Sequence, residues 1–247
     1  MICGLVIDLD GSKECPADAQ LMGRTLAAYP LISAQACRQI KRLYLVTDSP
    51  PVKAVALQYE AVIVDPPPGE SHIDPAARVA HGWRFMKEDL KAEGTVDLVV
   101  LLFAHAAAIT TETLDQGIDL MLSDPRLDSA MTVTRSDFCH PASAFRETGE
   151  RLTPYVSPRP AAGAAWFPDL AATVLRPRCL DAMGAEGPFP WLGANIMPLK
   201  RDGTCPVDHR WQMPLLQSWL KDNGVPDLTT VLEPQPKLQP QPKQDRR

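Results

Sequence analysis

Short apolar runs alternate with amphipathic segments along most of this chain. Strand-like runs lie at residues 2–7, 43–47, 61–64, 97–103, 130–134 and 171–175. Apolar residues spaced three and four positions apart predict helices at about 19–38, 74–91, 111–121 and 213–221. A further helix is expected after Asp48-Ser-Pro-Pro, because proline is tolerated in a first helical turn. This alternation predicts a mostly parallel sheet with helices on both faces, a three-layer α/β/α domain.

Two segments depart from the alternation. Residues 135–172 contain an irregular stretch rich in Pro and Gly, which predicts a small extension of the domain. Residues 233–247 are rich in Gln, Pro and Lys and have no apolar residue after Leu238, which predicts a disordered tail. We therefore expect one domain over residues 1–232.

Composition and charge narrow the range of partners. The 247 residues are 45% hydrophobic and 22% charged, which is typical of a soluble globular protein. The net charge of −5 argues against nucleic acid or an anionic membrane as the main partner. Six cysteines without a C-x-x-C pair favour reduced thiols, and the chain opens on a strand-like run without a basic leader. These features predict a cytoplasmic protein.

The loop after the first strand is the main candidate for chemistry, because doubly wound sheets bind ligands at the carboxyl ends of their strands. One interpretation is a phosphatase of the haloacid dehalogenase type, in which Asp8 would be the nucleophile and Asp10 its acid/base partner. That family also needs a carboxylate pair after a later apolar strand. Residues 102–106, which follow the most apolar strand, contain none.

A second interpretation accounts for more of the chain. Gly11-Ser12-Lys13, followed by Pro16, resembles the glycine-rich loop of the acylneuraminate cytidylyltransferases, the CMP-sialic acid synthetase family. Further segments resemble the rest of that family in unbroken order, over about residues 2–222 in all. They are 23–29, 45–49, 54–61, 99–102, 128–133, 169–176, 193–198 and 206–216.

The resemblance implies an activity and a site. A cytidylyltransferase of this family transfers CMP from CTP to a sugar acid, a nonulosonic acid or a related one, and releases pyrophosphate. It implies that Gly11, Ser12 and Lys13 hold the phosphates and that Asp48 lies near the nucleotide. It also implies that Asp208 binds Mg²⁺ and acts in catalysis with Lys13, and that the 135–172 extension joins two copies into a homodimer.

Several positions differ from the family pattern. Leu9 and Asp10 replace an arginine and a glycine of the loop, Asp65 replaces another arginine, and Pro206 replaces the first residue of the metal-binding pair. Apolar or uncharged residues replace the polar substrate loop at Phe103, His105, Ala106 and Ile109. This loss of cations leaves a second hypothesis open, a catalytically degenerate paralogue that acts as a binding or regulatory partner. Asp48 has an alternative role as a helix cap, and His105 as a hydrogen-bonded structural histidine.

Overall fold

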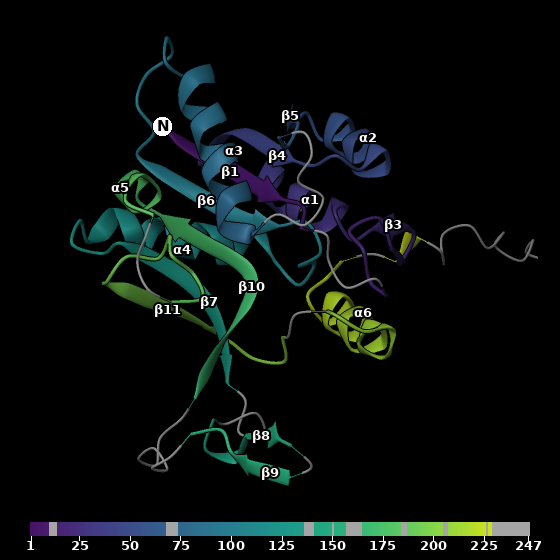
Figure 1. Cartoon of the computed structure of the whole chain (residues 1–247). Helices are drawn as coiled ribbons and strands as arrows, with labels where there is room; N and C mark the ends of the chain where they lie inside the picture. Colours follow the sequence, from purple (N-terminus) through teal and green to yellow (C-terminus); the bar gives the residue numbers. More distant parts are fainter. Residues whose placement is uncertain are drawn as a thin grey trace, which may run out of the picture.

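A seven-stranded mixed sheet forms the centre of the molecule (Figure 1). The computed structural model describes residues 1–9, 14–67, 74–135, 141–149, 151–156, 165–183, 187–204, 207–225 and 227–228. The strand order is β11-β7-β10-β6-β1-β4-β5. The strands are β1 (Ile2–Ile7), β4 (Ile40–Val46), β5 (Val62–Val64), β6 (Leu98–Phe103), β7 (Ser129–Arg135), β10 (Trp166–Leu175) and β11 (Ile196–Arg201). Only β10 runs antiparallel to its neighbours, β6 and β7.

Helices cover both faces of this sheet, as the sequence predicts. One face packs against α1 (Ala28–Ala36), α2 (Pro50–Gln58) and α4 (Thr111–Ser123), and the other against α3 (Pro75–Asp89) and α5 (Pro177–Asp181). The alternating side chains of β6 show both contacts. Leu98, Val100 and Leu102 join the core under α1 and α4, whereas the residues between them join the core under α3. A further helix, α6 (Met213–Asp222), lies beyond the carboxyl edge of the sheet (Figure 1).

The helix expected over 19–38 is shorter than the periodicity indicates. Residues 20–25 form a hairpin of β2 (Gln20–Leu21) and β3 (Arg24–Thr25), and α1 begins only at Ala28. The hairpin turns through Met22 and Gly23, whose φ angles are 52° and 80°. Two successive positive φ values make the tight turn that joins antiparallel strands, so this backbone conformation decides against a continuous helix.

The extension over 135–172 contains a second hairpin. It is formed by β8 (Phe145–Thr148) and β9 (Arg151–Pro154) and stands away from the main sheet at the ends of β7 and β10 (Figure 1). A short 3-10 helix, Pro141–Ser143, precedes it. Three large apolar residues of this hairpin region are exposed: Phe145, Leu152 and Tyr155. The predicted tail, 233–247, lies outside the described residues.

The described cysteines are free thiols, as the sequence predicts. Cys3, Cys15, Cys37 and Cys179 are buried free thiols, whereas Cys139 and Cys205 lie outside the described residues. Burial raises the pKa of the Cys3 thiol to about 11. In the part of the chain that the structure describes, every helix is too short or too polar to cross a membrane.

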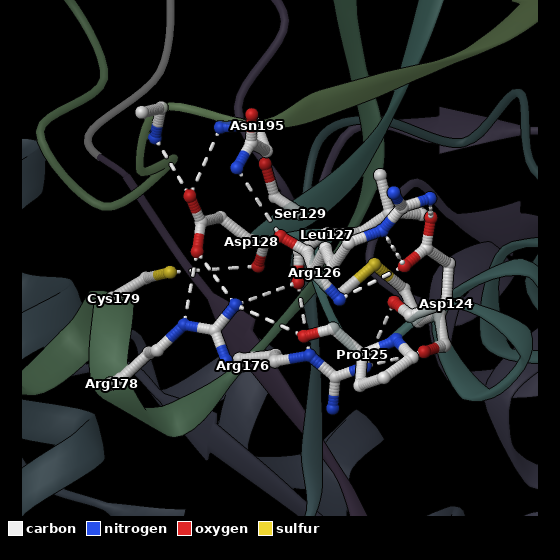
Figure 2. A network of polar contacts seen from close by, with 12 residues as sticks. Asp124, Pro125, Arg126, Leu127, Asp128, Ser129, Arg176, Arg178, Cys179 and Asn195 are labelled. Atoms are coloured by element: carbon white, nitrogen blue, oxygen red, sulfur yellow. Dashed lines mark hydrogen bonds and ion pairs between the residues drawn. The ribbon is translucent and has the colours of Figure 1, made fainter.

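A polar network around Asp128 holds the amino-terminal end of β7 (Figure 2). Its carboxylate accepts hydrogen bonds from the Arg178 guanidinium and from the backbone N–H groups of Ala194 and Asn195. The donors lower the pKa of Asp128 below its usual value. Arg176 donates to the carbonyls of Met121 and Asp124 at the end of α4. This network therefore fastens the 187–195 loop and two helices to the sheet, away from the candidate site.

Gly193 is required by this network, and its replacement is expected to destabilise the fold. A Cβ at Gly193 would lie 2.5 Å from the Asp128 Cβ, and the φ angle is +74°. Gly224 has a similar φ of +77°, but a Cβ there meets nothing within 4 Å. Gly224→Ala should cost about 1 kcal/mol from backbone conformation alone. Gly193→Ala should cost about 1–3 kcal/mol more, measured by urea denaturation. Equal losses in the two variants would contradict this account of Gly193.

Candidate functional site

The carboxyl ends of the parallel strands meet at one edge of the sheet. The chain passes from β1 to β4 and β5 on one side, then crosses to β6 on the other side of β1. Strand order therefore reverses at β1, and doubly wound sheets bind ligands at such a reversal. The residues at this edge follow β1, β4 and β6 and include Asp8, Thr47 and His105.

Asp8 anchors the start of the first loop. The Thr47 hydroxyl donates to the Asp8 carboxylate over 2.6 Å, and the Arg78 guanidinium of α3 donates to the Asp8 carbonyl. Asp8 and Arg78 are 7% and 1% exposed. A carboxylate nucleophile must reach its substrate, whereas this one is buried against a hydroxyl. Its geometry favours a structural role, and the partner that a phosphatase would need, Asp10, lies outside the described residues.

Asp208 lies beside the first loop, although some 200 residues separate them in sequence. The link is Glu14, the first described residue after Gly11-Ser-Lys13. Its carboxylate accepts from the backbone N–H of Arg210 over 3.2 Å and lies 3.4 Å from the His209 Nδ1. The Gln212 side chain accepts from the N–H groups of Asp208 and His209, both at 2.8 Å. Thus the start of a 3-10 helix (Arg210–Gln212) holds Asp208 in place.

His105 lies at the end of β6, next to β1. The backbone N–H of Ala104 donates to the Ile7 carbonyl, so the chain continues along β1 before it turns. The imidazole is 6% exposed and packs 6.2 Å from the Phe103 ring, centroid to centroid. Burial lowers the pKa of His105, and the negative charge of Asp208 acts in the opposite direction.

A buried ionic cluster supports the same edge from β7, β10 and β11. The Asp169 carboxylate accepts from the hydroxyls of Thr132 and Thr204 and lies 3.4 Å from the Arg201 guanidinium. Arg201 also donates to the Ala108 carbonyl and stacks on the Trp219 ring of α6. Sequence reasoning missed this cluster. A lone aspartate in an otherwise apolar strand was the available signal, since buried carboxylates need partners.

The residues predicted from sequence have mixed outcomes. Gly11, Ser12 and Lys13 lie outside the described residues, so their predicted phosphate contacts stay predictions. Asp48 is exposed and does not cap α2, because Ser49 occupies the N-cap position and its backbone N–H donates to the Thr47 hydroxyl. The N-cap of α4 is Thr110, whose side chain accepts from the backbone N–H of Thr113.

Among the described residues, no group of three His, Cys, Asp or Glu side chains is arranged to hold a metal by itself. Magnesium is commonly held by one or two carboxylates together with substrate phosphates. Asp208, whose segment contacts Glu14, would supply one carboxylate to a site of that second kind.

Known protein structures share the fold of this chain. No family model and no curated sequence matches the chain. A solved structure of CMP:2-keto-3-deoxy-manno-octonic acid synthetase complexed with CTP aligns over 90% of this chain and 99% of its own, with a TM-score of 0.63 and 14% identity. The chain shares the α/β fold of this structure. This confirms the nucleotidyltransferase-like fold expected from the resemblance.

Two further structures agree. The structure of a 4-diphosphocytidyl-2C-methyl-D-erythritol synthase from Anaerococcus prevotii aligns over 90% of this chain and 96% of its own chain, with a TM-score of 0.60 and 10% identity. Another structure of a synthase of that name aligns over 89% of this chain and 97% of its own chain, with a TM-score of 0.64 and 11% identity. At these identities, the comparisons show a shared fold and do not carry over individual site residues.

Proposed function

We propose that this protein is a cytidylyltransferase that transfers CMP from CTP to a sugar acid, a nonulosonic acid or a related one. The observation that carries the proposal is the contact between Glu14 and the 208–212 segment. It brings the segment of Asp208 to Glu14, which follows Gly11, Ser12 and Lys13 in the sequence. A phosphate loop and a carboxylate at the point where strand order reverses are the parts that nucleotidyl transfer needs.

In this proposal the glycine-rich loop binds the triphosphate. Backbone N–H groups of Gly11 and Ser12 can approach phosphate oxygens closely, and the Lys13 ammonium offsets their charge. Asp208 would hold Mg²⁺, which neutralises phosphate charge when it is bound. An acceptor hydroxyl loses its proton and its oxygen bonds to the α-phosphorus, while the bond from that phosphorus to pyrophosphate breaks.

The exposed hairpin supports a homodimer as part of the proposal. Phe145 and Tyr155 are 59% and 64% exposed, and Leu152 is 70% exposed. Apolar side chains gathered on a projecting hairpin are typical of an interface. We further propose that the protein acts in the cytoplasm, where its thiols stay reduced.

Purified protein with CTP, Mg²⁺ and a panel of acids is expected to release pyrophosphate. The panel includes 2-keto-3-deoxy-manno-octonic acid and N-acetylneuraminic acid. Asp208→Asn should raise the Mg²⁺ concentration needed for half-maximal rate about tenfold, roughly 1.4 kcal/mol of binding, because an anionic ligand becomes neutral. Asp202→Asn, an exposed neighbour, is the matched control. Pyrophosphate release no higher than in a protein-free blank would refute the catalytic proposal.

The altered positions favour a second candidate, a binding or regulatory paralogue. Leu9 packs against the core under α3, and Asp65 pairs with Lys53, so both positions serve the fold instead of the phosphates. A paralogue that has lost the nucleotide would show no rise in melting temperature with millimolar Mg²⁺ and CTP. A clear rise would support the nucleotide site, because binding to the native state stabilises it.

A further inference from the structure

A pocket lies between α3 and α5, on the face of the sheet that these two helices cover. Its volume is about 530 Å³, and small-molecule sites have volumes of about 300–1,000 Å³. Asp8, Thr47 and His105, which follow the carboxyl ends of β1, β4 and β6, are not among its lining residues. The pocket is therefore separate from the candidate site described above.

One wall of this pocket is apolar. Trp83 of α3 and Leu180 of α5 are 3% and 4% exposed, and Met183 continues the wall. Ala77 and Ala80 also line the pocket. They are three positions apart on α3, so they lie on one face of the helix. Their short side chains leave the space that a larger residue would fill.

The charged residues among the described lining residues are Arg84, Lys87 and Asp181. The Asp181 carboxylate accepts from the Trp83 indole N–H over 2.8 Å and from the Lys87 ammonium over 2.6 Å. Burial would raise the pKa of Asp181, but the hydrogen bonds from Lys87 and Trp83 outweigh it and lower the pKa below its usual value. Asp181 is therefore ionised and compensates the charge of Lys87.

Arg84 is the remaining cation of this pocket. It is exposed and has no hydrogen bond or ion pair with any residue in the described part of the chain. Two cations against one carboxylate make the rim of the pocket positive, in a chain whose net charge is −5. An anion is the ligand that would complete this charge distribution.

We propose that this pocket binds a small organic anion whose carboxylate or phosphate pairs with Arg84 while its apolar body packs against Trp83. A guanidinium binds carboxylate and phosphate oxygens through two parallel hydrogen bonds, which fixes the orientation of the anionic group. The indole ring is already oriented, because its N–H is bonded to Asp181 and the Lys87 ammonium lies 5.1 Å from the ring centre. A flat apolar group can therefore pack on it without rearrangement.

The first test uses ¹⁹F NMR titrations of the wild-type protein. The probes are 4-fluorobenzoate and 4-fluorophenyl phosphate, with 4-fluorobenzamide as the uncharged counterpart. At least one anion should show a saturable shift at millimolar concentration, and the amide should bind about tenfold more weakly, the worth of one charge-assisted hydrogen bond. The anion that binds more tightly identifies the preferred group. Equal affinities for the amide and the anions, or no saturable shift with either anion, would overturn the proposal.

The same titration separates this site from the proposed nucleotide site. Millimolar CTP with Mg²⁺ should leave the affinity for the bound anion unchanged, since none of the residues proposed to hold the triphosphate is a described lining residue of this pocket. Displacement of the anion by CTP would assign the signal to the nucleotide site and would overturn the proposal. The result does not depend on whether the protein transfers CMP.

Two variants locate the bound anion. Arg84→Glu should weaken its binding by about tenfold or more, because the cation that pairs with it becomes a carboxylate. Arg38→Glu is the matched control, because it makes the same change in net charge at an exposed arginine in the turn between α1 and β4. Ala80→Met exchanges two good helix formers and fills the pocket, so it should also abolish binding. Melting temperatures show which variants are folded. Wild-type affinity in folded Arg84→Glu or Ala80→Met protein would overturn the proposal.

Discussion

Replacing Lys13 with alanine is expected to lower the rate of pyrophosphate release by about 10²–10³-fold. In the proposed reaction, negative charge shifts onto the leaving pyrophosphate as its bond to the α-phosphorus breaks. An ammonium held at that position stabilises the transition state more than the bound nucleotide. The loss should therefore appear mainly in kcat, with a smaller rise in the KM for CTP.

Lys41 supplies the matched control for this experiment. It is an exposed lysine near the start of β4, at the opposite edge of the sheet, and it donates to the Arg38 carbonyl. Lys41→Ala should retain the wild-type rate. If Lys13→Ala also retained the wild-type rate, the first loop would not be the phosphate site. The carboxylates of Asp8, Asp10 and Asp18 would explain that result, because they repel a triphosphate.

Replacing Asp169 with alanine is expected to destabilise the protein by about 3–5 kcal/mol. The Asp169 and Arg201 side chains are 1% and 9% exposed, and the carboxylate also accepts from the backbone N–H of Ala171. Without it, the buried Arg201 guanidinium loses its counter-charge and the buried Thr204 hydroxyl loses the carboxylate to which it donates, whereas the Thr132 hydroxyl keeps the Ala172 carbonyl. For a domain of this size, the loss corresponds to about 6–20 °C in melting temperature.

Two further variants separate the ion pair from general damage. Asp202→Ala removes an exposed carboxylate close to Arg201 in sequence and should change stability by less than about 0.5 kcal/mol. The double variant Asp169→Ala with Arg201→Met leaves no unpaired buried charge, so its loss should be smaller than the sum of the single losses. Additive losses would show that the two residues act independently.

The Asp169 cluster also connects stability to the candidate site. Arg201 donates to the Ala108 carbonyl, in the loop that contains His105. Burial lowers the pKa of Arg201, and the neighbouring Asp169 carboxylate acts in the opposite direction. The cluster thus joins the loop after β6 to β10, β11 and α6.

Strands and helices with one dominant local signal were predictable from sequence. The apolar runs at 2–7 and 97–103 are β1 and β6, because a strand buried on both faces needs apolar residues at almost every position. The helices at 74–91 and 213–221 are α3 and α6 within two residues, since their apolar faces repeat with helical spacing. The order of these elements predicted a three-layer α/β/α domain, and the nucleotidyltransferase-like fold was expected from the family resemblance.

Elements that depend on an unusual backbone conformation were not predictable from the sequence. The 20–25 hairpin depends on positive φ angles at Met22 and Gly23, and no periodicity reports a φ angle. The alternative role of Asp48 as the cap of α2 is wrong, because the N-cap is Ser49, a difference of one position that side-chain chemistry alone does not resolve.

The amino-acid sequence by itself determined the layers of this protein and its core, because periodicity is a local property. Only the tertiary structure decided that Glu14 holds the segment of Asp208 and that Asp169 pairs with Arg201. Only it showed that the His105 Nδ1 has no partner among the described residues. These facts depend on chain segments that meet after folding, and on how burial changes the cost of a charge or an unpaired nitrogen.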